Sequence, residues 1–351
     1  MRAYQIFDKK DKSIFGYNRI MKFFKFTRYT EWWEYKLVPL LTIGYAVIYL
    51  NNYPFDHAIL RLLFLLLSII IGAVYVSIIN DVTDIEEDAS AGKKNRMADL
   101  APWKRISLVA LSILLGLFFA CQIYPDKISL FFYSMAWVVF SLYSIPPVRL
   151  KKRRIWGVFC DASGAHLFPT LLIIYNLAFV FGTMPNTVWA VSAGVWAISC
   201  GLRGILWHQF SDRDNDIASG TTTFASHVKP ENFKIQEIIL FIIEIGAFAL
   251  LLSYVFNLLI LLSLFLYFLL VLIRKFSFGN NTTLIIPPKN GSYQILMNDY
   301  YLVFFPLCLL IMIALRNNYG WIVLCCHLIL FPQKTIFIAK HYISFLKSKL
   351  G

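Results

Sequence analysis

Long apolar runs alternate with short polar connections along most of the chain. A membrane-spanning helix needs about 20 mostly apolar residues, because its backbone groups must form their hydrogen bonds within the segment. Ten runs approach this length, but residues 254–257 barely separate the seventh from the eighth, so the pattern predicts nine or ten transmembrane helices. The runs are 34–51, 58–80, 104–122, 128–145, 157–181, 186–210, 236–253, 258–273, 299–316 and 320–340. We therefore predict an all-α fold, a polytopic membrane helical bundle.

Composition supports this fold class and narrows the possible partners. Hydrophobic residues make up 58% of the 351 residues and charged residues 15%, which is outside the range of soluble globular proteins. The net charge of +13 is compatible with nucleic-acid binding, but the Lys and Arg residues mostly flank apolar runs, where lipid and topology account for them. We expect membrane lipids as partners and no nucleic acid. The six cysteines show no CxxC spacing, which argues against a zinc site or a disulfide framework.

The polar connections differ in charge in an alternating order. Basic residues are dense in the first thirty residues and after the second, fourth, sixth and eighth runs, whereas segments 51–57 and 181–187 contain no Lys or Arg. Because Lys and Arg are retained on the cytoplasmic side, we expect the even-numbered runs to end in the cytoplasm. We predict a basic interfacial segment at 1–33 and a single multi-pass transmembrane domain at 34–345.

Two acidic clusters are joined directly to long apolar runs. The first acidic cluster is residues 80–88 (NDVTDIEED), and the second is residues 212–216 (DRDND). Like charges one helical turn apart repel each other, and acids near a bilayer indicate a functional site. Several of these residues recur at four-residue steps, which places them on one face of a helix. Carboxylate and amide oxygens suit Mg²⁺ bound to a phosphorylated substrate. The predicted metal ligands are Asn80, Asp81, Asp84, Asp88, Asp212 and Asp216.

Three motifs in this order resemble those of a known family. The first acidic cluster resembles the NDxxDxxxD signature of the UbiA superfamily of intramembrane prenyltransferases. Asp212-x-x-x-Asp216, with the Gly and Thr residues that follow it, is similar to the second DxxxD motif of that family. Residues 143–151 (YSIPPVRLK) resemble the YSxPPxRLK segment after the fourth helix of many members. The resemblance covers roughly residues 34–316.

The resemblance implies a bundle around a central cavity, with a prenyl diphosphate held by two Mg²⁺ ions between the two motifs. It implies Mg²⁺-dependent transfer of the prenyl group to an aromatic or other lipophilic acceptor, with Mn²⁺ as an alternative metal. Metal ions stabilise the departing diphosphate as Lewis acids, and preorganised Lys and Arg side chains add to this effect. The predicted cationic catalytic residues are Lys94, Arg96, Arg149 and Lys151, with Arg153 and Arg213 behind them.

The sixth run carries candidates for the acceptor side of the site. His208 and Gln209 lie one helical turn before Asp212, and a neutral imidazole is a common general base near pH 7. We therefore predict His208 as a catalytic residue. The predicted substrate-binding residues are Tyr143, Arg203, Gln209 and Arg213. Charged or polar side chains inside a span are normally paired or line a polar cavity, where some are expected to contact the acceptor. Further residues of this kind are Asp161, His166, Asn176 and Glu244.

Two other functions stay open at this stage. A terpene cyclase of the same family would use the same metal site and quench the cation internally. A membrane transporter would account for charges inside the spans, such as Arg203 and Glu244. However, both acidic clusters lie at the ends of runs, whereas transporter sites usually lie near the middle of the bilayer. The sequence therefore favours an enzyme that transfers a prenyl group.

Overall fold

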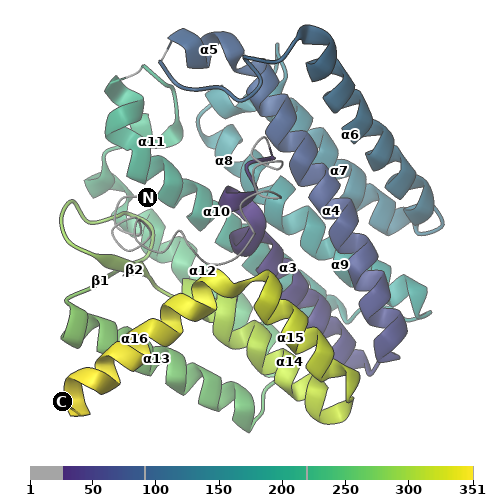
Figure 1. The fold of residues 1–351 in the computed structure, drawn as a ribbon, viewed down its shortest axis with the longest axis vertical. Helices are drawn as coiled ribbons and strands as arrows, with labels where there is room; N and C mark the ends of the chain where they lie inside the picture. The colour runs from purple at the N-terminus through teal and green to yellow at the C-terminus, as the bar shows by residue number, and fades with distance from the viewer. Residues whose placement is uncertain (1–26, 91, 219, 351) are drawn as a thin grey trace.

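The structure, a computed structural model, describes residues 27–90, 92–218 and 220–350. Within these ranges the chain folds almost entirely into helices, which pack into one bundle (Figure 1). This confirms the predicted all-α membrane bundle. Residues 1–26 of the predicted interfacial segment at 1–33 lie outside the described residues, and the first described long helix begins before residue 33.

Each apolar run coincides with a helical segment. The long helices are α3 (Tyr29–Asn51), α4 (Phe55–Thr83), α6 (Pro102–Ile123), α7 (Lys127–Ser144), α10 (Thr187–Ala218), α12 (Lys234–Ser253), α13 (Leu258–Phe278) and α16 (Pro332–Leu350). The fifth run is continuous but contains a π-helical turn, and it consists of α8 (Ile155–Ala162), η3 (Ser163–Leu167) and α9 (Phe168–Val180). A π-helical turn also opens the ninth run, which consists of η5 (Tyr300–Phe304) and α14 (Phe305–Arg316). The tenth run begins with α15 (Tyr319–Leu330) and continues into α16.

Short elements form the connections at the ends of the long helices. These are α5 (Ile85–Ser90), the 3₁₀ turns η2 (Leu150–Lys152) and η4 (Pro230–Phe233), α11 (Phe224–His227), and the strands β1 (Asn281–Thr283) and β2 (Tyr293–Ile295). The two strands form a small parallel pair in which Thr282 lies opposite Gln294. The η2 segment contacts the first acidic cluster, α11 is tied to the last turns of α10, and β1 follows the end of α13.

Polar side chains fix where several helices begin. Asp126 accepts a hydrogen bond from the Ser129 N–H at 3.1 Å and starts α7. Asn257 accepts from the Ile260 N–H at 3.1 Å and starts α13, so the short polar break between the seventh and eighth runs does separate two helices. Such caps satisfy backbone donors that have no partner within the first helical turn.

The main hydrophobic core surrounds α3, which packs against α4, α9 and α14. Most residues of α3 from Leu37 to Ile48 are buried, on every side of the helix. A second, smaller core lies where α8, α10 and α11 meet. It contains Val158, Leu206, Phe210, Ala225, Phe233 and Ile285. This smaller core supports the end of α10 that carries the second acidic cluster.

Seven helical segments in the described part of the chain are long and apolar enough to cross a membrane, or eight if α15 and α16 form one broken span. The expected count of nine or ten is therefore not confirmed. Helix α3 carries Glu31, Glu34 and Lys36 near its start, which lowers its hydropathy. The segment Tyr300–Arg316 is apolar but shorter than the others, and α15 meets α16 at an angle of 86°.

Two helices are longer than a bilayer requires. Helix α4 has 29 residues and α10 has 32, which correspond to about 43 Å and 48 Å at ~1.5 Å per residue. The hydrocarbon core of a bilayer is about 30 Å thick, so the last turns of both helices extend beyond it. These turns hold the second acidic cluster and the start of the first, which continues into α5. The elements that follow them, α5 and α11, lie at the same end of the bundle (Figure 1).

Helix α10 approaches α8 closely at one glycine. A Cβ atom placed on Gly201 would lie 2.8 Å from Ala162 Cα and 2.9 Å from His166 Cδ2. Since the first of these is a backbone atom, the two helices would have to move apart to admit a side chain. Gly204 lies one turn further along α10 and has open space at the same position.

We predict that Gly201→Ala destabilises the protein by about 1–3 kcal/mol, the usual cost of overpacking a well-packed contact. Gly204→Ala is the matched control, and it should be neutral or stabilise by up to about 1 kcal/mol, because alanine restricts the unfolded chain and favours a helix. Thermal unfolding of the purified protein in detergent, followed by tryptophan fluorescence, measures both. Equal midpoints for the two variants would contradict the close approach of α10 and α8.

Candidate active site

The first acidic cluster spans the end of α4 and helix α5, and cations surround it. Asp81 is 1% exposed and forms an ion pair with Arg28 and a second with Arg96, whose Nη1 lies 3.6 Å from Asp81 Oδ2. Asn95 Nδ2 donates to the Asp81 carbonyl oxygen and to Asp88 Oδ2, both at 2.8 Å. The loop after α5 is therefore folded back onto the cluster.

The basic segment that follows α7 closes over the same cluster. Arg149 Nη2 donates to Asp84 Oδ1 at 2.6 Å, and the same guanidinium bonds the Glu87 carboxylate. Lys151 Nζ donates to Asn80 Oδ1 at 2.8 Å and also pairs with Asp84. The turn η2 thus brings a guanidinium and an ammonium group to the side chains that the sequence predicts as metal ligands.

Burial and pairing act in opposite directions on these charged groups. Burial lowers the pKa of the Lys151 ammonium group, while its ion pair with Asp84 favours the charged form. Burial alone would raise the pKa of Glu87, but hydrogen bonds from Lys152 and Arg149 hold this pKa below its ordinary value. Glu87 is therefore ionised near neutral pH. The positive charges of Arg149 and Lys152 balance its negative charge.

The second acidic cluster lies at the end of α10 and is more exposed. His208 Nδ1 lies 3.5 Å from Asp212 Oδ2, and both side chains are more than half exposed. Asp216 Oδ2 accepts a hydrogen bond from Thr223 Oγ1 at 3.1 Å. Gln209 Oε1 accepts from the Phe224 N–H at 3.1 Å, which holds the start of α11 against α10.

Arg213 fixes the segment that follows the second cluster. Its Nε donates to the Ala225 carbonyl at 3.0 Å and to the Val228 carbonyl at 3.3 Å. Together with the Gln209 contact, these bonds tie residues 223–228 to the last turns of α10. Both predicted substrate-binding residues on this stretch of α10 thus shape the loop beside the site.

The two clusters share one end of the bundle. Lys93, in the loop after α5, interacts electrostatically with Asp216 of α10. Within the described residues no three His, Cys, Asp or Glu side chains are close enough to form a metal cluster. The potential donors in both acidic clusters are hard oxygen atoms, and the carboxylates of the first attract Arg28, Arg96, Arg149 and Lys151. This donor set and its demand for positive charge fit Mg²⁺.

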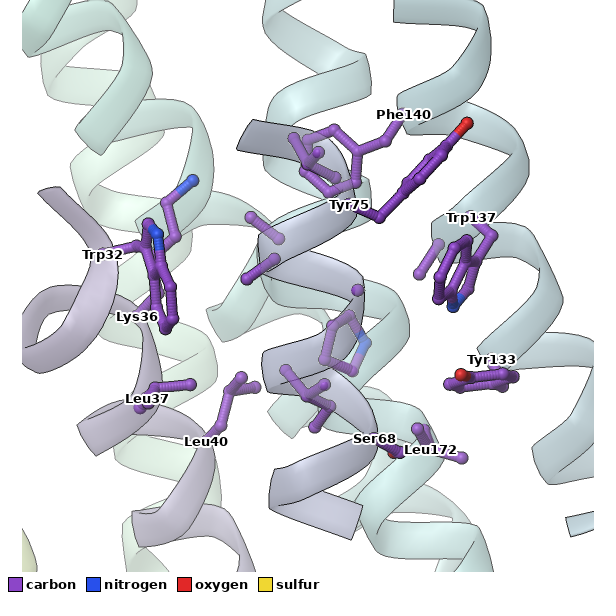
Figure 2. A pocket seen from close by; sticks show the side chains of 18 of the residues that line it. Trp32, Lys36, Leu37, Leu40, Ser68, Tyr75, Tyr133, Trp137, Phe140 and Leu172 are labelled. Atoms are coloured by element: carbon purple, nitrogen blue, oxygen red, sulfur yellow. The ribbon is translucent and has the colours of Figure 1, made fainter. Parts of the chain in front are cut away.

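An apolar cavity of about 110 Å³ lies between α3, α4, α7 and the η3–α9 segment. Figure 2 shows Trp32 and Lys36 on one side of it and Tyr75, Tyr133 and Trp137 on the other. Tyr75 and Ser77 of its lining lie one to two turns before the first acidic cluster on α4. The cavity therefore lies directly beneath the cluster.

Comparison with known proteins agrees with this geometry. The sequence model of the UbiA prenyltransferase family matches residues 37–284, which is more than half of the chain. The chain belongs to the UbiA prenyltransferase family. It is accordingly an integral membrane protein, as its apolar helices indicate. The chain has no significant match among curated protein sequences.

A solved structure of a UbiA homologue from Archaeoglobus fulgidus has the same fold. The form bound to GPP and Mg²⁺ is 18% identical, with a TM-score of 0.57 over 87% of this chain and 99% of that one. The form bound to DMAPP and Mg²⁺ is 15% identical, with a TM-score of 0.45 over 92% of this chain and 99% of that one. At this identity the likeness concerns the fold alone.

Some residues predicted for the UbiA site lie elsewhere or at its edge. Arg203 is buried within the bundle, where its Nε lies 2.9 Å from Glu244 Oε2 and its Nη2 donates to the Leu296 carbonyl at 3.0 Å. Lys94 is exposed on the loop after α5. Tyr143 interacts electrostatically with Asp84, which places it beside the first acidic cluster. The roles of these residues remain predictions.

Two residues of the candidate site were not predicted from the sequence. Arg28 pairs with Asp81, but it comes at the end of a basic stretch that topology alone explains. Lys36 lines the cavity, yet it lies within the first apolar run. A charged residue inside a predicted span indicates a functional site, and this was the only feature of the sequence that could have identified Lys36.

We predict that Asp81→Asn lowers the free energy of unfolding by about 2 kcal/mol, because it removes the buried carboxylate that pairs with Arg28 and Arg96. Asp212→Asn is the matched control, because Asp212 is about half exposed and its loss should change stability little. Thermal unfolding in detergent compares the two. A larger loss of stability for Asp212→Asn than for Asp81→Asn would refute this account of the first cluster.

Proposed function

We propose that this chain is a Mg²⁺-dependent prenyltransferase that moves a prenyl group from its diphosphate to a lipophilic acceptor. The observation that carries this proposal is the placement of the first acidic cluster and the basic segment over an apolar cavity, with the second acidic cluster at the same end of the bundle. Its fold is shared with the homologue that is bound to GPP and Mg²⁺, which supports the same class of donor substrate. We place the site on the cytoplasmic side, because Lys and Arg concentrate in these connections.

Mg²⁺ would be held by oxygen atoms of the two acidic clusters. The proposed ligands are Asn80, Asp84, Asp88, Asp212 and Asp216, with Asp81 as a further candidate that pairs with Arg28 and Arg96 in this structure. Bound Mg²⁺ supplies Lewis-acid stabilisation of the diphosphate oxygens. These ligands come from the ends of α4 and α10 and from α5. Both long helices extend beyond the hydrocarbon core of the membrane, so these residues lie outside it.

The cationic side chains would bind and orient the diphosphate. Arg149 and Lys151 already bond oxygen atoms of the first cluster, so a diphosphate between the clusters lies within reach of both. Arg96 approaches from the opposite loop. Fixed positive groups of this kind stabilise negative charge that develops on a leaving group. Lys94 is exposed and would contribute to the same field from further away.

The apolar cavity would hold the hydrocarbon part of the substrate. At about 10–15 Å³ for each water-sized sphere, 110 Å³ corresponds to about seven to eleven such spheres. This suits one or two isoprene units. The walls include Trp32, Trp137 and Tyr75, whose ring faces attract positive charge on an allylic carbon and exclude water from it.

The acceptor side of the proposal includes His208. Its imidazole lies beside Asp212 and is exposed, so it is available to take a proton at the mouth of the site. Because it also contacts Asp212, a substitution of His208 would affect both the acceptor and the second acidic cluster. Cyclisation of the prenyl chain by the same site is the alternative within the family. A transporter is disfavoured because Arg203 and Glu244 bond each other inside the bundle.

We predict that prenyl transfer requires Mg²⁺ or Mn²⁺ and stops in EDTA. Asp84→Ala should lower turnover by at least about a hundredfold, the scale seen when one preorganised electrostatic group is lost. Asp99→Ala is the matched control, since Asp99 is exposed on the loop before α6. The assay measures diphosphate release and organic products with a panel of prenyl diphosphates, together with Mg²⁺ binding by calorimetry. Full activity in EDTA would exclude the proposed metal site.

We predict that residues 81–103, 146–156 and 211–235 all face the cytoplasm. A protease site inserted into each segment should be cut in inverted membrane vesicles and protected in right-side-out vesicles. A site inserted at 181–187 is the control and should show the opposite behaviour, because that connection has no Lys or Arg. If 81–103 and 211–235 lay on opposite sides, the two clusters could not share one diphosphate.

A further inference from the structure

One charged residue lines the apolar cavity and pairs with an acid outside the lining, and we call this ion pair the rim of the cavity. Lys36 of α3 is the one charged residue among the described residues that line the cavity. Its Nζ lies 3.5 Å from Asp161 Oδ1 of α8, and the two side chains are 32% and 17% exposed. In Figure 2 the Lys36 ammonium group extends past Trp32, away from Leu40 at the far end of the cavity.

Two further polar side chains connect this pair to the proposed site. His166 interacts electrostatically with both Lys36 and Asp161, and it belongs to the π-helical turn η3. Tyr143 interacts with Asp161 on one side and with Asp84 of the first acidic cluster on the other. Electrostatic interactions through Tyr143 therefore link the Lys36–Asp161 pair to the first acidic cluster. Single π-helical turns within α-helices occur frequently at functional sites.

The Lys36–Asp161 pair has unused hydrogen-bonding capacity. Its separation of 3.5 Å is longer than the roughly 2.7–2.9 Å of a charge-assisted hydrogen bond. An ammonium group has three donors, and an ionised carboxylate accepts about four hydrogen bonds. A hydroxyl group can satisfy both residues at once, because it accepts from Lys36 and donates to Asp161.

We infer that Lys36, Asp161 and His166 bind the polar head of the acceptor, and that this head is an uncharged hydroxyl group of a phenol or an alcohol. This inference rests on the proposed prenyl transfer. The formal charges of Lys36 and Asp161 cancel, so the rim offers no net charge to a second anion. A carboxylate placed there would lose its hydration and lie beside Asp161 without a cation of its own.

The test compares two matched probes, benzyl alcohol and benzoate, of which only the first carries a hydroxyl group and only the second a carboxylate. Binding to the full-length protein in detergent is measured by calorimetry without Mg²⁺ and without prenyl diphosphate. The wild-type protein should bind the alcohol about tenfold more tightly, the scale of one hydrogen bond to a charged group. Asp161→Asn leaves Lys36 uncompensated, so it should reverse this order and tighten binding of the benzoate by about tenfold.

Two controls keep the result specific. Asp99→Asn makes the same chemical change at an exposed position and should leave the order of the two probes unchanged. Lys36→Met should weaken binding of the alcohol and should not tighten binding of the benzoate. Lys104→Met makes the same change at an exposed position and serves as its control. Each variant is accepted only if it elutes as the wild-type protein does in gel filtration.

Three outcomes would overturn the inference: equal or tighter binding of the benzoate to wild type, an unchanged order in Asp161→Asn, or no binding of either probe to wild type. Because this measurement needs neither metal nor turnover, it is independent of the proposed reaction. Absence of diphosphate release from every prenyl diphosphate would reject the prenyltransferase, whereas the probe order alone decides the rim site.

Discussion

Compensation of negative charge at one end of the bundle is the constraint on which the site depends. Helix α4 ends in acidic residues that would repel each other, and the helix can continue to Thr83 because cations from three other segments meet them. Arg28 comes from the start of the first helix, Arg96 from the loop after α5, and Arg149 from the segment after α7. The ion pairs therefore also tie together parts of the chain that are distant in the sequence.

The charged cluster and the apolar cavity lie in adjacent layers of the protein and need opposite surroundings. The polar layer needs water or ions around its carboxylates, whereas the cavity beneath it is lined almost entirely by hydrocarbon and aromatic rings. Helices α4 and α10 satisfy both requirements because their apolar portions cross the membrane and their last turns continue beyond it. A reaction that separates a charged leaving group from a hydrocarbon chain needs such a boundary.

The sequence predicts the fold class and both acidic clusters, because apolar runs and charge spacing are local features. Their ion-pair partners are harder to predict. Arg149 and Lys151 were found through a motif, but Arg28 resembles an ordinary topology charge, and its contact with Asp81 spans 53 residues. Arg203 was expected at the substrate, yet it pairs with Glu244, because two charges inside a bundle neutralise each other where the helices allow it. The span count differed for a similar reason: α3 lies in the protein core, so its burial does not require a fully apolar sequence.

The short α14–α15 hairpin has a consequence for the surrounding bilayer. The Tyr300–Arg316 segment has 17 residues and α15 has 12, or about 25 Å and 18 Å at ~1.5 Å per residue, before the chain turns through 86° into α16. Both are shorter than a hydrocarbon core of about 30 Å, a case of hydrophobic mismatch. A bilayer that matches these lengths would be thinner at this corner than beside α4. Amphiphilic molecules would then partition differently to the two sides of the protein.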